Sequence, residues 1–358
     1  MALYSEKLKH PKWQKKRLEI FQRDNWQCVQ CGDSDTELSV HHTVYRRGVN
    51  PWEYDGNELI TLCVNCHENA HGVIDSFHVG NLLHAAFKRV EEPFFGNLTG
   101  VPSGFRFIDR KLGGFQNSEL IVIAGRPGMG KTALALTIAW HITVEAGIPA
   151  ALFSLESDDF QISTRILCAQ AGLDPVRLKR GHINREDWRR MTNVLGILQD
   201  APLFIDTSNG LSLGTIERRI RKIRSEKNLG IAIIDNLKMM GNTRSDDREI
   251  LRRMKETAKE TGIPIILLSQ LDGQMEERTD KRPRLYDLRG TDILSIADVV
   301  LFLYRDEVYN RAPENPLLGK AEIEIAKNRH GPVGRSVLGF TEQYGLFNEL
   351  KRFPREET

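Results

Sequence analysis

The sequence predicts an α/β protein with a mostly parallel sheet, preceded by a small domain that zinc holds together. A β-branched run, a glycine-rich turn and a helix-forming segment follow one another in residues 121–140. Strand-like runs then alternate with helix-like segments, which favours parallel strands with helices on both faces. Near the N-terminus, four cysteines form two C-x-x-C pairs, a spacing typical of structural zinc sites.

The composition indicates a globular chain of about two domains. Of the 358 residues, 40% are hydrophobic and 27% are charged, with a net charge of +2. No apolar run reaches the roughly 18 residues of a transmembrane helix, and Met1–Arg23 lacks the apolar core of a secretory signal. We therefore expect no membrane partner and a reducing, cytoplasmic compartment, where cysteines bind metal rather than form disulfides.

Residues 1–75 are expected to form the zinc domain. Pro11–Arg23 predicts a basic helix with proline in its first turn. In so small a domain the metal supplies much of the folding free energy, about 10–16 kcal/mol in zinc-finger peptides. Four thiolates suit tetrahedral Zn²⁺, and the expected ligands are Cys28, Cys31, Cys63 and Cys66.

A second pattern runs through the same residues: Leu38-Ser-Val-His41-His42, then Asn57-Glu-Leu-Ile-Thr-Leu-Cys63 and Cys66-His67. It resembles the HNH nuclease family, with its ββα-metal core, over roughly Trp13–His71.

The resemblance implies that His42 is the general base that activates water, and that His41 and His67 hold a catalytic metal. Asn57 would fix the loop or join the metal shell, and His71 is a weaker candidate ligand. The chemistry is coherent, because a metal steadies the leaving oxygen while a near-neutral base deprotonates water.

The same residues also fit a module that binds DNA or a partner without cutting. Residues 24–75 contain nine Asp and Glu against Arg46 and Arg47, and an acidic surface repels phosphate. His67 and His71 could simply pack beside the zinc. The sequence leaves nuclease and non-cutting module open.

Residues 76–98 are expected to be a linker helix. Asn81–Val90 carries apolar residues on one helical face, and Glu91-Glu-Pro93 ends it. This helix either docks on its own domain or a neighbouring copy, or is a plain packed linker.

The most specific motif is Ile121–Thr132, which contains G-x-x-x-x-G-K-T between an expected strand, Ile121–Ala124, and an expected helix, Ala133–Trp140. Successive backbone N–H groups and a helix N-terminus form a cradle for phosphate. Lys131 would place its charge on the β- and γ-phosphates, and the Thr132 hydroxyl would ligate Mg²⁺. The expected nucleotide-binding residues are Gly125, Arg126, Pro127, Gly128, Met129, Gly130, Lys131 and Thr132.

The rest of the chain predicts further strands and helices. The strands are Ala150–Ser154, Leu203–Ile205, Ile231–Ile234, Pro264–Ser269, Val299–Tyr304 and Glu322–Ala326; the helices are Phe160–Ala171, Glu186–Leu198, Leu213–Glu226 and Arg248–Thr261. Residues 306–320 predict a polar hairpin.

Polar residues follow three of these strands, where ligands of a parallel sheet collect. Asp235 can hold Mg²⁺ through water. Glu156 can polarise the attacking water. Gln270 can sense the γ-phosphate or relay to a DNA-binding loop.

From Thr99 to about Leu350, the chain resembles the C-terminal RecA-like motor of DnaB-type replicative helicases. The family implies a ring of six, ATP at the subunit boundaries and single-stranded DNA in the channel. Lys327 and Arg329 would then reach the γ-phosphate bound by the neighbour. The motifs that carry the resemblance are Gly125–Thr132, Phe153-Ser-Leu-Glu156, Ile233-Ile-Asp235, Leu268-Ser-Gln270, Lys281–Arg289 and Ala326–Pro332.

The chain departs from that family at both expected DNA loops. Asn236–Arg248 is short, and the segment Leu285–Ile293 diverges after Arg289. Residues 99–358 are thus expected to be an ATP- and Mg²⁺-dependent ATPase with one of three functions. The first is a helicase fused to a nuclease, as suits a phage or mobile element. The second is a helicase whose zinc module only binds DNA or a partner. The third is an ATPase that assembles without unwinding DNA.

Overall fold

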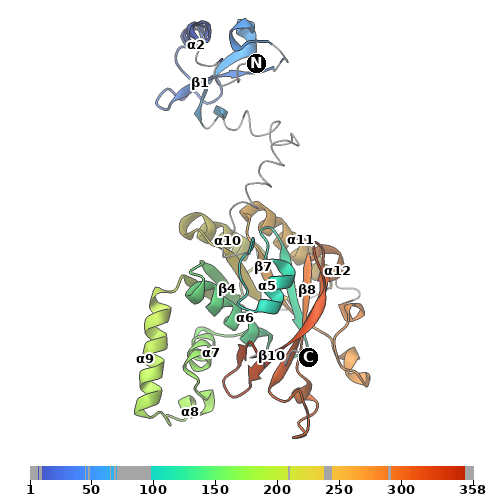
Figure 1. The fold of residues 1–358 in the computed structure, drawn as a ribbon. Coiled ribbons are helices and arrows are strands. Elements are labelled where there is room, and N and C mark those ends of the chain that lie inside the picture. Colours follow the sequence, from blue (N-terminus) through green and yellow to red (C-terminus); the bar gives the residue numbers. More distant parts are fainter. Residues whose placement is uncertain are drawn as a thin grey trace, which may run out of the picture. The chain divides into compact units, whose positions relative to one another are not determined.

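In the computed structural model the chain forms two compact units, residues 1–91 and 92–358 (Figure 1). Within the described residues, no helix is long and apolar enough to cross a bilayer. The expected linker helix, Asn81–Val90, lies outside those residues. The structure describes residues 7, 10–44, 46, 49–64, 66, 67, 70, 98–208, 210–237, 244–288 and 292–350.

The first unit packs a helix on a two-stranded antiparallel hairpin. The predicted helix is α2 (Pro11–Arg23), whose first turn is capped because His10 Nδ1 accepts a hydrogen bond from the Lys12 N–H at 3.2 Å. Strand β1 (Leu38–His42) pairs with β2 (Leu59–Cys63), and two 3₁₀ turns lie between them. The small core contains Trp13, Ile20, Phe21, Val40, Tyr54 and Leu59.

The second unit is built on one sheet. Within the described residues its nine strands run in the order β11-β10-β9-β8-β3-β7-β6-β4-β5. The six from β8 to β5 are parallel, and β9, β10 and β11 continue the sheet antiparallel. The strands are β3 (Leu120–Gly125), β4 (Ala150–Ser154), β5 (Leu203–Asp206), β6 (Ile231–Asp235), β7 (Ile265–Gln270), β8 (Val299–Tyr304), β9 (Lys320–Asn328), β10 (Gly334–Thr341) and β11 (Leu346–Asn348).

Helices cover both faces of this sheet (Figure 1). Strand β3 is buried along its whole length, and its side chains alternate between two cores. Ile121 and Ile123 pack with α5 and α6, whereas Val122 packs with α10 and α11. The helices are α5 (Arg106–Leu112), α6 (Lys131–Trp140), α7 (Asp159–Ala171), α8 (Pro175–Lys179), α9 (Arg185–Asp200), α10 (Leu213–Lys227), α11 (Arg244–Thr261) and α12 (Ile293–Ile296).

The predicted strands all form, with ends that shift by at most a few residues. Helix α11 begins at Arg244 rather than Arg248. The prediction of a hairpin for residues 306–320 is wrong. This segment starts with a 3₁₀ turn, and hydrogen bonds from side chains stabilise it in place of paired strands. Asn315 Nδ2 donates to Asp306 Oδ2 at 2.9 Å and to the Asn310 carbonyl at 2.7 Å.

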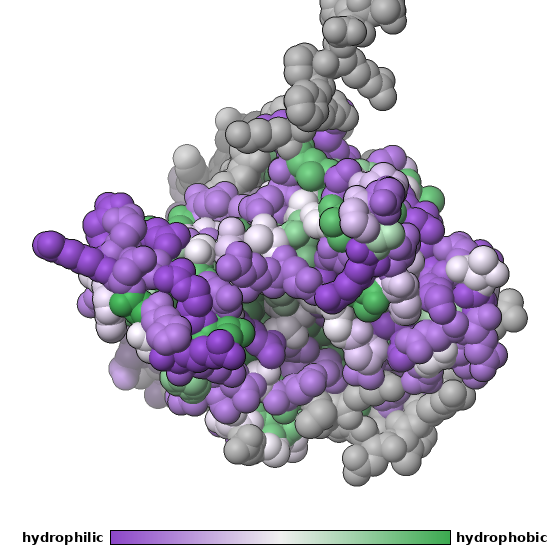
Figure 2. All heavy atoms as spheres, turned by 90° about the horizontal axis from the view of Figure 1, so that it is seen from below, coloured by the Kyte–Doolittle hydropathy of each residue, from purple (hydrophilic) through white to green (hydrophobic). Residues whose placement is uncertain are grey.

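The face of the second unit in Figure 2 is largely hydrophilic, with apolar side chains scattered among polar ones. Scattered exposed apolar residues are normal for a protein surface. The informative polar groups are therefore those that the fold buries.

One such group lies just before β3. Glu119 is 7% exposed, and burial together with the negative charge of Asp298 raises its pKa to about 7, against the opposing effect of Lys255. Asp298 Oδ2 in turn accepts hydrogen bonds from the Leu120 N–H at 2.8 Å and from Lys255 Nζ at 2.5 Å. A carboxyl with a raised folded pKa stabilises the fold most below its unfolded pKa, and that contribution is lost as pH rises through about 7.

Replacing Glu119 with glutamine should therefore change how stability depends on pH. Relative to the wild type, Glu119→Gln is expected to gain about 2 kcal/mol in free energy of unfolding between pH 5 and pH 8. Urea denaturation at both pH values measures this, with the exposed Glu186→Gln as control. A difference between variant and wild type that stays constant across this range would contradict it.

Candidate functional site

The glycine-rich loop joins the carboxyl end of β3 to the N-terminus of α6. Gly128 and Gly130 have φ values of +78° and +93°, in the left-handed region that favours glycine. Lys131 Nζ donates to the carbonyls of Gly125 at 2.8 Å and Arg126 at 3.1 Å, so the side chain folds back over the loop. The loop and the helix N-terminus together form an anion cradle.

A hydroxyl and a carboxylate meet at the edge of this cradle. Thr132 Oγ1 donates a 2.6 Å hydrogen bond to Oδ2 of Asp235, the last residue of β6. Burial raises the pKa of Asp235, and the hydrogen bond from Thr132 lowers it in part. Oxygen ligands of this kind are those that Mg²⁺ prefers, so the two residues fit the predicted cation.

Two further polar residues stand at neighbouring strand ends. Glu156 follows β4, which pairs with β6, and Asn236 Nδ2 donates to Glu156 Oε2 at 2.6 Å. Gln270 ends β7 and pairs in register with Gly125. Asn236 was not among the predicted site residues, because its only signal in the sequence is its place directly after Asp235.

These side chains border one cavity of about 410 Å³, a size typical of small-ligand sites. Arg126 and Met129, both predicted here, turn their side chains elsewhere. Arg126 Nε donates to Glu276 Oε1 at 2.7 Å, and Met129 is buried. The lining includes Pro127, Gly128, Gly130, Lys131, Thr132, Glu156, Asp235, Asn236, Gln270 and the turn of residues 342–345 between β10 and β11.

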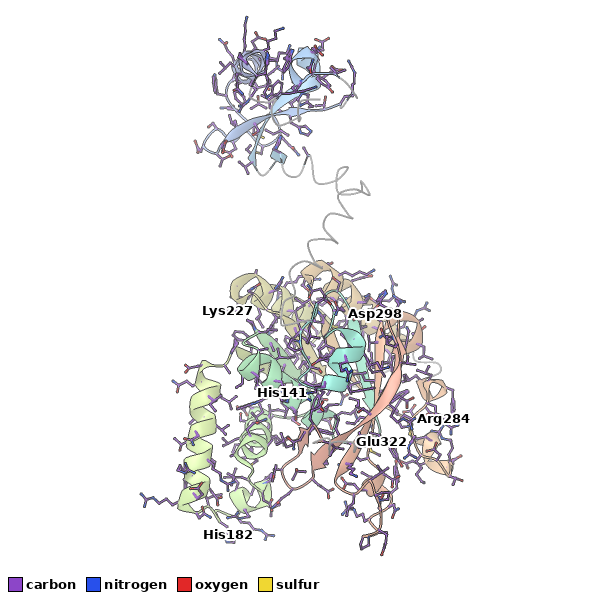
Figure 3. The ribbon with its side chains drawn as sticks, in the orientation of Figure 1. His141, His182, Lys227, Arg284, Asp298 and Glu322 are labelled. Atoms are coloured by element: carbon purple, nitrogen blue, oxygen red, sulfur yellow. The ribbon has the colours of Figure 1, made fainter. Side chains whose placement is uncertain are left out.

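Lys327 and Arg329 lie at the other end of the sheet. Lys327 Nζ donates to the carbonyls of Leu294 at 2.8 Å and Ala297 at 2.5 Å, and Arg329 Nη1 donates to Asp298 Oδ1 at 3.0 Å. Asp298 precedes β8, which runs parallel to β3, so it marks the amino ends of the strands. In Figure 3 Asp298 stands at the upper end of the sheet. Neither cation lines the cavity.

In the first unit, the predicted zinc ligands come together. Four Sγ atoms lie within 4.8 Å of one another, those of Cys28, Cys31, Cys63 and Cys66. Although burial opposes it, hydrogen bonds from backbone N–H groups lower the pKa of Cys28 to about 6, while hydrogen bonding to Cys31 raises the pKa of Cys66. Clustered thiols cannot all ionise without a cation between them, so this donor set fits Zn²⁺.

Of the predicted site histidines, the three that the structure describes in this unit separate into two groups. His41 and His42 are adjacent on β1, and the alternation of a strand directs them to opposite faces. His42 is 4% exposed and stacks on Trp13 at 5.1 Å, with Tyr54 edge-on at 4.6 Å. The His41 ring lies 5.3 Å from the His67 ring. The fold thus brings His41 and His67 together and directs His42 into the small core.

Asn57 is exposed in the 3₁₀ turn before β2, near the pairing of His42 with Leu59. His71 lies outside the described residues.

Comparison with known proteins gives one consistent result for the second unit. A family model described as the DnaB-like helicase C-terminal domain matches residues 100–349. The replicative DNA helicase DnaC of Bacillus subtilis is 40% identical over 265 residues, which cover 72% of this chain and 58% of the relative. The chain thus spans little more than half of that relative.

Two solved structures resemble the same region. One is titled as an ATPase domain, with a TM-score of 0.71 and 32% identity, covering 77% of this chain and 99% of that chain. The other shows a DnaB-like replicative helicase and its interactions with primase. Its TM-score is 0.69 at 33% identity, and the match covers 76% of this chain and 66% of that chain.

Proposed function

Because this chain belongs to the family that shares the DnaB-like helicase C-terminal domain, we propose that residues 99–358 form an ATP-hydrolysing, ring-forming DNA motor of the helicase type. Residues 1–75 would be an appended zinc module and residues 76–98 a linker. ATP and Mg²⁺ are the ligands that fit such a domain.

The observation that carries this proposal is the 2.6 Å bond from Thr132 to Asp235 at the mouth of the phosphate cradle. In the proposed site, the loop amides and Lys131 bind the phosphates, and Thr132 and Asp235 hold the cation. Bound Mg²⁺ would neutralise charge on the phosphate oxygens. Glu156, positioned by Asn236, orients and deprotonates the attacking water. Gln270 would contact the γ-phosphate.

The place of Lys327 and Arg329 supports a site shared between subunits. Both lie at the amino ends of the strands, whereas the cradle follows a carboxyl end. A head-to-tail contact between copies would bring these two ends together, and such contacts close into rings when the rotation allows. We propose a hexamer with single-stranded DNA in its channel, and with Lys327 and Arg329 acting on the neighbour's nucleotide.

Strand displacement on a forked duplex tests the motor. The wild type should displace a strand with ATP and Mg²⁺, and Lys131→Ala should lose at least about 10²-fold in rate, because phosphate loses its cation. The exposed Lys222→Ala serves as control. Displacement that persists in Lys131→Ala would disprove a role for this loop, and ATP hydrolysis without displacement would favour an assembling ATPase.

Mixing two inactive variants tests the shared site. Arg329→Ala should bind ATP nearly as the wild type does but hydrolyse it about 10³-fold more slowly, as expected for an arginine finger. A mixture of Arg329→Ala and Lys131→Ala should recover part of the ATPase rate, since some boundaries then contain both intact groups. Arg335→Ala, similarly exposed at 43% against 45%, is the control. Undiminished turnover in Arg329→Ala would refute the assignment.

For the first unit we propose a Zn²⁺ site at Cys28, Cys31, Cys63 and Cys66. A second candidate function, HNH-type DNA cleavage, is favoured by the His41–His67 ring contact, which places two metal-binding side chains together. The burial of His42 against Trp13 favours instead a module that only binds DNA or a partner. In the nuclease, His42 would be the base, and Asn57 would support His41 and His67.

DNA nicking decides between these two functions. If the module cuts, the wild type should nick circular DNA with Mg²⁺ or Mn²⁺, and His42→Ala and His67→Ala should each lower the rate about 10²-fold, as expected for general-base or metal loss. Both variants should keep one zinc per chain, which shows that the module is folded. Absence of nicking by zinc-loaded wild type leaves the binding module.

A further inference from the structure

One buried arginine has no part in the chemistry proposed above. Arg305 directly follows β8, and its side chain is 5% exposed. A guanidinium buried to this degree is costly unless it is paired and hydrogen-bonded. Its partners therefore indicate what the fold gains from it.

On one side, Arg305 contacts the phosphate-binding loop. Its Nη1 donates to the Gly128 carbonyl at 3.1 Å, and its backbone N–H donates to Met129 Sδ at 3.2 Å. In a trans peptide, the carbonyl of residue 128 and the N–H of residue 129 point in opposite directions. The bond to Gly128 thus fixes that peptide plane, whose Met129 N–H donates to the Arg126 carbonyl at 3.3 Å within the loop.

On the other side, the same guanidinium binds two carboxylates. Glu307, also buried, accepts from Nε at 2.9 Å and from Nη2 at 2.5 Å, and its other oxygen accepts from the Gly319 N–H at 2.8 Å. Nη2 also donates to Glu342 Oε1 at 3.1 Å. The guanidinium carbon stands 4.0 Å over the Phe340 ring, a favourable cation–π arrangement.

Glu342 belongs to the turn of residues 342–345, which lines the same cavity as the loop residues. We infer that Arg305 is a positioning residue that fixes the phosphate-binding loop and this turn relative to each other. The inference rests on the proposed nucleotide site, which Arg305 does not itself line. Only a planar, multidentate donor can reach Gly128, Glu307 and Glu342 at once, so lysine is not an equivalent here.

The test compares full-length Arg305→Lys and Arg305→Met with Arg311→Met. Arg311 is an exposed cation that contacts the same Glu342 at 3.3 Å. In Arg305→Lys, the Kd values for ATP and for ADP should both rise about tenfold, equivalent to about 1.4 kcal/mol, because both nucleotides place a β-phosphate on the loop. KM for ATP should rise with them, kcat should change less than threefold, and Arg311→Met should match the wild type.

The melting temperature separates positioning from folding. Arg305→Lys retains the charge and should melt close to the wild type; if Arg305→Met fails to fold, the lysine variant alone decides. Wild-type affinity for both nucleotides in Arg305→Lys, with or without a lowered melting temperature, would overturn the inference. A wild type that binds neither nucleotide would instead refute the proposed function.

Discussion

The structure depends on one constraint, which is that a loop of main-chain amides must be held open to an anion at the carboxyl edge of a parallel sheet. The loop follows β3, and the carboxylate that accepts the Thr132 hydroxyl ends β6, with β7 between them. Parallel strands bring all these ends to one edge. The 2.6 Å bond between Thr132 and Asp235 therefore depends on the register of three strands, β3, β7 and β6.

Buried charged side chains lie at both ends of that sheet. At the amino ends, Asp298 accepts bonds from Arg329, Lys255 and the start of β3. At the carboxyl ends, Arg305 joins Glu307 to the phosphate-binding loop. The free-energy cost of burying each of these charges is offset only when all of its hydrogen-bond and ion-pair partners are present. Such networks fix the geometry beside the cradle and beside the proposed trans-acting cations, as the proposed site between neighbouring copies would require.

The first unit has a different physical basis. Its core is small, and one helix and one hairpin bury few side chains. Four cysteine sulfurs within 4.8 Å provide a second centre of cohesion once a cation joins them. The same hairpin directs His41 towards His67 and His42 towards Trp13. The two neighbouring histidines of β1 thus differ in role: His41 lies beside a second metal-binding side chain, whereas His42 packs in the core.

The sequence by itself predicted the sheet class, most strand positions, the helix Pro11–Arg23 and the cradle, because these depend on local periodicity and on glycine and lysine at fixed spacing. It missed β10, where Gly334 and Gly339 weaken the strand pattern, and β11, which has only three residues. It misassigned residues 306–320, where side-chain bonds from Asn315 replace a ladder. The contacts of Asn236 with Glu156 and of Arg305 with Gly128 join residues far apart in the chain. Only the tertiary structure decided these, because a single side chain carries no periodic signal, and its partners are set by the packing of strands that local sequence does not encode.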